Sequence, residues 1–109
     1  MRIQKEQRDS WLVVHLNGRL DADTTAEFSS VLAECLDAGS TRIVMNCKDL
    51  AYISSAGLRG MLNLAKKLAA AKGLLHFCGL SGMVKEVFEI SGFTDMFVIK
   101  DDVDAACQE

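Results

Sequence analysis

The sequence predicts a single α/β domain over residues 1–109, with a mixed sheet of about five strands and about four helices. Short apolar runs that suit buried strands alternate with segments whose apolar residues recur at helical spacing. Such alternation indicates β-α-β crossovers, which are right-handed and lay helices against mostly parallel strands. A tight turn joins the first two strands, so we expect them to form an antiparallel hairpin at the N-terminus.

The strands are predicted from apolar runs. Residues 2–6 are a weak candidate for an edge strand, and the other predicted strands are 11–16, 42–47, Leu74–Cys78 and 96–99. The unbroken run Ile43, Val44 and Met45 is typical of a strand covered on both faces, as in a parallel sheet. Asn17-Gly18 is expected to start a turn after the second strand.

The first helix is predicted to open at Asp23-Thr24. Thr24 and Glu27 have the spacing of a capping box, in which each side chain accepts a backbone N–H of the other residue. Apolar residues then follow at helical spacing, and Gly39 is expected to close the helix.

Later helices have similar signals. A second helix is predicted over about residues 55–72, with Gly73 at its end. A third is predicted to begin at Ser81 as a cap and to end at Gly92. Residues 101–107 are predicted to form a last, acidic-headed helical turn.

Composition and charge argue against several classes of function. Half of the residues are hydrophobic, a quarter are charged and the formal net charge is −3, which disfavours nucleic acid or an anionic membrane as the partner. The polar N-terminus has no signal-peptide core, and no apolar run approaches membrane-spanning length, so we expect a cytoplasmic protein.

The cysteines predict no metal site. They form no Cys-x-x-Cys pair, and neither histidine lies at ligand spacing from them; they are Cys35, Cys47, Cys78 and Cys107. The first three fall in apolar periodic segments, which favours buried free thiols in a reducing compartment. We therefore expect no metal and no cofactor.

The stretch 49–59, Asp-Leu-Ala-Tyr-Ile-Ser-Ser-Ala-Gly-Leu-Arg, is the most unusual in the chain. It places two hydroxyls and a glycine where a helix begins, and the first N–H groups of a helix have no partner within it. One interpretation is an N-cap serine followed by a tolerated glycine. The other is a docking surface with little side-chain cover, whose hydroxyl accepts a phosphoryl group near free N–H donors and the positive helix end.

This stretch resembles the signature of the STAS domain of bacterial anti-sigma factor antagonists. That signature is Asp-Leu, an aromatic, an aliphatic, Asp-Ser, a small residue and Gly-Leu, followed by a helix. The residues that match it in register are Asp49-Leu50, Tyr52, Ile53, Ser55, Ala56, Gly57 and Leu58. Residues 16–21 (Leu-Asn-Gly-Arg-Leu-Asp) and 84–93 are also similar to family patterns, so the resemblance covers nearly the whole chain.

The resemblance implies a protein that catalyses nothing. In the family, the unphosphorylated form binds an anti-sigma factor, which is itself a serine kinase of the GHKL ATPase type, and frees the sigma factor. The kinase phosphorylates the serine that matches Ser55, the complex dissociates, and a PP2C-type phosphatase restores the active form. Asp21 matches a family residue near the kinase contact.

Ser54 departs from the pattern, because many phosphorylated members carry aspartate at this position. It removes a negative charge beside the acceptor and supplies a second candidate hydroxyl. Arg59, one turn into the helix, is the basic residue of this helix that we expect to touch a partner. The predicted partner-binding residues are Asp21, Ser54, Ser55, Ala56, Gly57 and Arg59.

Three other functions share features with this sequence. The serine turn resembles the nucleophile elbow of α/β-hydrolases, but Ile53 replaces its first glycine and no base is identifiable for Ser55. A receiver-like phosphoaspartate switch could use Asp49, but the first strand ends in Asn17-Gly18 rather than in acidic residues. A STAS scaffold without phosphorylation, or an accessory subunit of a transporter or stress-signalling complex, would have the same fold and turn.

Overall fold

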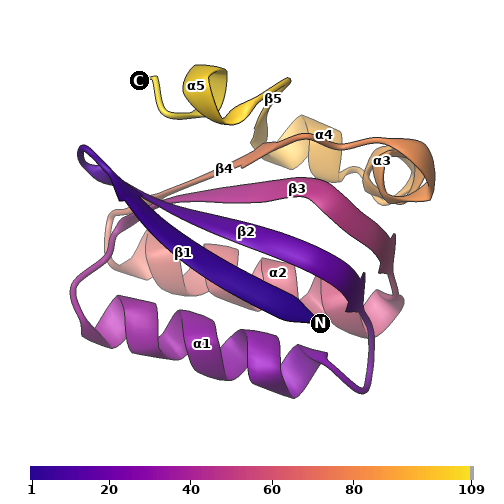
Figure 1. Ribbon diagram of the computed structural model, residues 1–109, viewed down its shortest axis with the longest axis horizontal. Helices are drawn as coiled ribbons and strands as arrows, with labels where there is room; N and C mark the ends of the chain where they lie inside the picture. The colour runs from indigo at the N-terminus through magenta and orange to yellow at the C-terminus, as the bar shows by residue number, and fades with distance from the viewer. Residues whose placement is uncertain (109) are drawn as a thin grey trace.

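The computed structural model describes residues 1–108, in which five strands form one sheet (Figure 1). The strands are β1 (Arg2–Arg8), β2 (Trp11–Leu20), β3 (Arg42–Ile53), β4 (Leu74–Cys78) and β5 (Val98–Lys100). They lie in the order β1-β2-β3-β4-β5; β1 and β2 pair antiparallel and every other pair is parallel. The predicted mixed α/β sheet with an N-terminal hairpin is confirmed.

The helices are α1 (Thr25–Asp37), α2 (Ser55–Ala70), α3 (Gly82–Ile90), α4 (Phe93–Met96) and α5 (Val103–Ala106). In Figure 1, α1 and α2 lie side by side under one face of the sheet, and α5 lies over the other face. The four-residue α4 was not predicted. Within residues 1–108, α2 is the longest helix with 16 residues, and no helix has the length and apolar character needed to cross a bilayer.

Buried side chains lie on both faces of the sheet. The larger cluster fills the space between the sheet and α1 and α2, and its members include Val14, Met45, Phe28, Met61 and Phe77. A smaller cluster on the other face, beneath α5, consists of Trp11, Val13, Val44, Cys78 and Ala106. The unbroken apolar run in β3 therefore alternates between two cores, as expected for a strand covered on both faces.

The turn predicted at Asn17-Gly18 is wrong. The strand continues to Leu20, because two register shifts, between His15 and Asn17 and between Gly18 and Arg19, let β2 follow β3 to its end. Gly18 has a φ of 111°, which a side chain would oppose, so the glycine serves a β-bulge rather than a turn. As a result β2 and β3 extend beyond β4 and end together.

The predicted capping box at the start of α1 is also wrong. The Thr24 hydroxyl makes no capping bond; it donates to the Arg19 carbonyl at 2.8 Å and accepts from the Asp21 N–H at 2.9 Å. The end of α1 is as predicted. Gly39 has a φ of 95° and its N–H donates to the Leu36 carbonyl, which satisfies a helix-end acceptor.

Later helix ends follow the predictions with differences. Ser81 occupies the N-cap of α3, but its hydroxyl makes no capping bond. The helical turn near the C-terminus is confirmed as α5, where the Asp102 carboxylate accepts the Ala105 N–H at 2.9 Å. α2 stops at Ala70, and the left-handed residue after it is Lys72 (φ 57°) instead of Gly73.

The cysteines are free thiols, and Cys35, Cys47 and Cys78 are buried as predicted. Burial raises the pKa of the Cys78 thiol to about 11. Burial also raises the pKa of the half-buried Cys107 above its ordinary value. The thiols are therefore protonated at neutral pH and act as packing groups.

Candidate functional site

The site is built where β2 and β3 end at the same edge of the sheet. Leu20 pairs with Ile53, and the Ser54 N–H donates to the Leu20 carbonyl at 3.0 Å. The loop that follows β2 therefore lies beside the first turn of α2. Asp21, the first residue of that loop, therefore follows directly on the residue bonded to Ser54.

The two adjacent serines have different roles in the structure. Ser54 is the N-cap of α2, with extended φ and ψ of −98° and 176°, and its hydroxyl oxygen accepts the Gly57 N–H at 3.2 Å. Ser55 is the first residue of the helix and is exposed. The capping interpretation thus holds for Ser54 and leaves the Ser55 hydroxyl without that role.

Gly57 lies against the sheet instead of facing solvent. A Cβ atom at this position would approach the Leu20 carbonyl oxygen to 2.6 Å and the Ile53 Cγ1 atom to 2.9 Å, closer than such atoms pack. Gly57 is buried, so its lack of a side chain allows α2 to pack closely against β2. This position is therefore a packing position, and the exposed part of the turn is Ser55 with the half-buried Ala56.

Asp21 organises the loop before α1. Its Oδ1 atom accepts the N–H groups of Asp23 at 3.0 Å and Thr24 at 3.2 Å, and the Arg19 Nε atom lies 3.6 Å from its Oδ2 atom. Partial desolvation raises the pKa of the Asp21 carboxyl, but the hydrogen bonds from Asp23 and Thr24 and the charge of Arg19 outweigh it, so the pKa lies below its ordinary value. Asp21 is therefore an anion at neutral pH.

Arg19 and Tyr52 form a second part of this surface that the sequence did not indicate. They are neighbours across β2 and β3, and the Arg19 guanidinium lies over the Tyr52 ring, 4.1 Å from its centroid. This cation–π contact holds the Arg19 guanidinium beside Asp21. The register after a β-bulge brings the two together, and a bulge is not visible in the residue pattern.

Arg59 is the exposed cation of the first turns of α2. It lies four residues after Ser55, and the helix contains no acidic residue to pair with it. Within residues 1–108, Arg59 takes part in no ion pair. Its charge is thus available at the surface.

The histidines are held on the sheet face opposite α1 and α2. His15 bonds through Nε2 to the Glu6 carboxylate and through Nδ1 to the Asn46 amide, each at 2.9 Å. His76 is buried and its Nδ1 atom donates to the Ala106 carbonyl at 2.8 Å. Their bonds are those of packed, structural histidines, on the sheet face away from the helix that begins at the serine turn.

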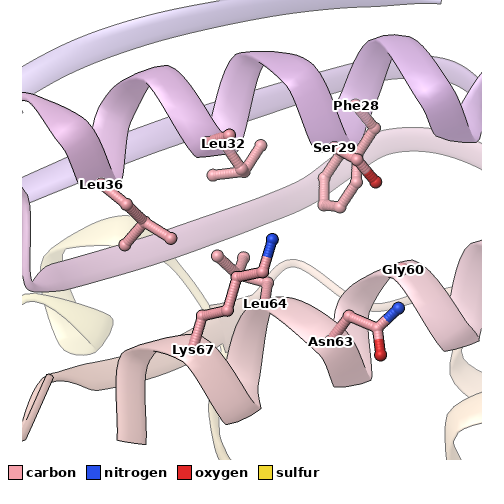
Figure 2. Close-up of a pocket in the computed structure, with 9 residues that line it drawn as sticks. Phe28, Ser29, Leu32, Leu36, Gly60, Asn63, Leu64 and Lys67 are labelled. Atoms are coloured by element: carbon pink, nitrogen blue, oxygen red, sulfur yellow. The ribbon is translucent and has the colours of Figure 1, made fainter. Parts of the chain in front are cut away.

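A groove between α1 and α2 lies apart from the serine turn (Figure 2). Its wall includes Phe28, Leu32 and Leu36 of α1, and Figure 2 shows the Lys67 side chain reaching from α2 toward α1. Gly60 also lines it, and a Cβ atom there would approach the Thr25 hydroxyl to 2.9 Å, so α1 and α2 pack closely at this glycine. The groove is a consequence of close helix packing.

Comparisons with known proteins identify the family. A family model described as the STAS domain matches residues 2–106. The chain belongs to the STAS domain family. BtrV of Bordetella bronchiseptica, whose name assigns it as an anti-sigma factor antagonist, is 38% identical to this STAS chain over 106 residues, which are 97% of the chain and 91% of BtrV. The anti-sigma-B factor antagonist of Staphylococcus aureus is 27% identical over 101 residues, which cover 93% of the chain and 94% of that relative.

Solved structures share the fold of this STAS domain. The anti-sigma factor antagonist SpoIIAA superposes with a TM-score of 0.74 in both its unphosphorylated and its phosphorylated form, at 21% and 23% identity. The two alignments cover 95% of this chain and 92% and 96% of the SpoIIAA chains. The predicted STAS fold is therefore confirmed by sequence and by structure.

Proposed function

We propose that the chain is an anti-sigma factor antagonist, a regulatory binding protein of the cytoplasm that is switched by phosphorylation of Ser55. In this account the unphosphorylated form binds an anti-sigma factor that is also a GHKL-type serine kinase, and the sigma factor is released. A PP2C-type phosphatase reverses the modification. The names of BtrV and of the Staphylococcus aureus relative support the antagonist role.

We choose Ser55 as the acceptor because the two serines have different roles in the structure. The Ser54 hydroxyl is occupied as the cap of α2, whereas Ser55 is exposed and makes no capping bond. A kinase would transfer the γ-phosphoryl group of ATP to the Ser55 oxygen, with loss of the hydroxyl proton and release of ADP. Serine is as good an N-cap as the aspartate common in the family. Ser54 therefore caps the helix as aspartate would, but it carries no negative charge.

A phosphoryl group on Ser55 changes the surface without unfolding the domain. It adds about −1.5 to −2 units of charge at neutral pH. The first N–H groups of α2 and the positive end of the helix stabilise an anion at this position. A partner that docks on the turn would meet this charge directly, beside the anionic Asp21.

A binding measurement tests the proposal. The cognate anti-sigma factor is titrated with the unmodified protein and with Ser55→Asp, and thermal unfolding of both forms is recorded. We expect Ser55→Asp to weaken binding by about tenfold or more. Its melting temperature should stay within about 2 °C of wild type, because substitutions of exposed residues rarely change stability much and Ser55 is exposed. A large loss of stability would instead show that Ser55 holds the helix start.

A pull-down with the unmodified protein identifies the class of partner. Recovery of a GHKL-type kinase supports the switch. Recovery of transporter or stress-complex components with no kinase would contradict it and favour a scaffold of the same fold.

A further inference from the structure

Ser55 and Arg59 lie four residues apart on α2, and both are exposed. In an α-helix, residues at this spacing face the same side, with Cβ atoms about 5–6 Å apart. A long guanidinium side chain at the fifth position therefore reaches a group attached to the side chain at the first. No other side chain of α2 offers Arg59 an anion, since the helix has no acidic residue.

We propose that Arg59 is the internal counter-ion of a phosphoryl group on Ser55. The proposal rests on Ser55 as the acceptor. A guanidinium bonds phosphate oxygens through two parallel N–H donors, which makes the pair stronger than one between a lysine and the same group. Phosphorylation then acts twice on the docking surface: it adds a dianion and it removes the free cation of Arg59.

Arg19 is the competing cation, and its contacts exclude it from this role. Its guanidinium lies 4.1 Å from the centre of the Tyr52 ring, and its Nε atom lies 3.6 Å from the Asp21 carboxylate. It would have to leave both groups to reach a phosphate on Ser55. Arg59 has no ion pair within residues 1–108 to give up.

The second pKa of the phosphoryl group on Ser55 shows whether Arg59 pairs with it. Phosphoserine is incorporated at position 55 during translation, so that no kinase is needed, and its second ionisation is followed by phosphorus NMR as the pH is varied. The second pKa of a phosphoserine is about 6. An exposed helix pair at this spacing shifts it by about 0.2–0.4 pH units, so we expect Arg59→Gln to raise the midpoint by that amount. Arg59→Lys should restore part of the shift, and 0.5 M salt should remove it.

Two matched variants decide the result. Lys66→Gln removes a cation of the same helix that lies about 16 Å along the helix axis from Ser55, beyond the screening length. This variant should leave the midpoint unchanged. Arg19→Gln should also leave it unchanged. Equal midpoints for the wild type and Arg59→Gln would overturn the proposal, and so would a shift produced by Arg19→Gln alone. Because the phosphoserine is placed by translation, these outcomes stand whether or not a kinase modifies Ser55.

Discussion

Replacing Gly57 by alanine tests whether the first turn of α2 requires a residue without a side chain. The added methyl group would lie 2.6 Å from the Leu20 carbonyl oxygen and 2.9 Å from the Ile53 Cγ1 atom. The first of these atoms is backbone in a paired strand, so it cannot rotate away. The start of α2 must move outward, and the bond from the Ser54 N–H to the same Leu20 carbonyl lengthens.

The size of the effect is the difference between two terms. Overpacking of a well-packed site costs about 1–3 kcal/mol. Alanine is favoured over glycine by up to about 1 kcal/mol inside a helix and by less near its end. The net loss of stability is about 1–2 kcal/mol, which for a domain of this length lowers the melting temperature by about 5–10 °C. The movement of the turn should also weaken binding of the anti-sigma factor.

Urea unfolding and calorimetry measure this loss, and Gly60→Ala is the matched control in the same helix. A Cβ atom at Gly60 meets the Thr25 hydroxyl at 2.9 Å, which is the end of a side chain, and ring carbons of Phe28 at no less than 3.7 Å. Because Thr25 can rotate and the helix gains an alanine, Gly60→Ala should change stability by less than about 1 kcal/mol. A Gly57→Ala protein as stable as wild type would refute the close-packing argument.

Three further predictions concern the neighbouring elements. Ser54→Ala should cost about 1 kcal/mol in urea unfolding, because it removes the cap of α2, whereas Ser54→Asp should retain wild-type stability. Lys72→Gly should raise stability by up to about 1 kcal/mol, since Lys72 has the left-handed φ of 57° that glycine adopts freely; an unchanged or lower melting temperature would contradict this. The folded-state pKa of Asp21 is lowered, so its stabilisation is present above the unfolded pKa near 4 and is lost as the pH falls through the folded value. Asp21→Asn should therefore show a shallower loss of stability below about pH 4 in unfolding curves taken over a pH series, and an identical slope would show that Asp21 contributes nothing there.

The parts of the fold that could be predicted depend on local patterns. The apolar run of β3 and the helical spacing of α1 are local, and both elements formed where they were expected. The strand was predicted over 42–47 and is longer, because β3 continues beside β2 to Ile53. The length of β2 could not be predicted, because Asn17-Gly18 favours a turn by composition and becomes a bulge only when β3 pairs beside it. The end of α2 was displaced for a similar reason. A Cβ atom at Gly73 would lie 2.2 Å from the Thr41 carbonyl oxygen, so this glycine is needed for close packing, and the left-handed φ belongs to Lys72.

The structure separates the roles of the residues at the predicted site. The order of residues around Ser55 indicated the turn, but only the backbone geometry separates the capping Ser54 from the exposed Ser55. Gly57 was predicted to contact a partner, and the close approach of the Leu20 carbonyl shows that it packs inward. The Arg19 contact with Tyr52 depends on the register between two strands, which residue spacing does not reveal.

Mapping the phosphorylated residue tests the central claim most directly. The protein is incubated with its kinase partner and ATP, digested and analysed by mass spectrometry, together with Ser54→Ala and Ser55→Ala. We predict one phosphate, located on Ser55, that persists in Ser54→Ala and is absent from Ser55→Ala. A phosphate on Ser54, or a Ser55→Ala protein that is still modified, would contradict the assignment of Ser55 as the switch.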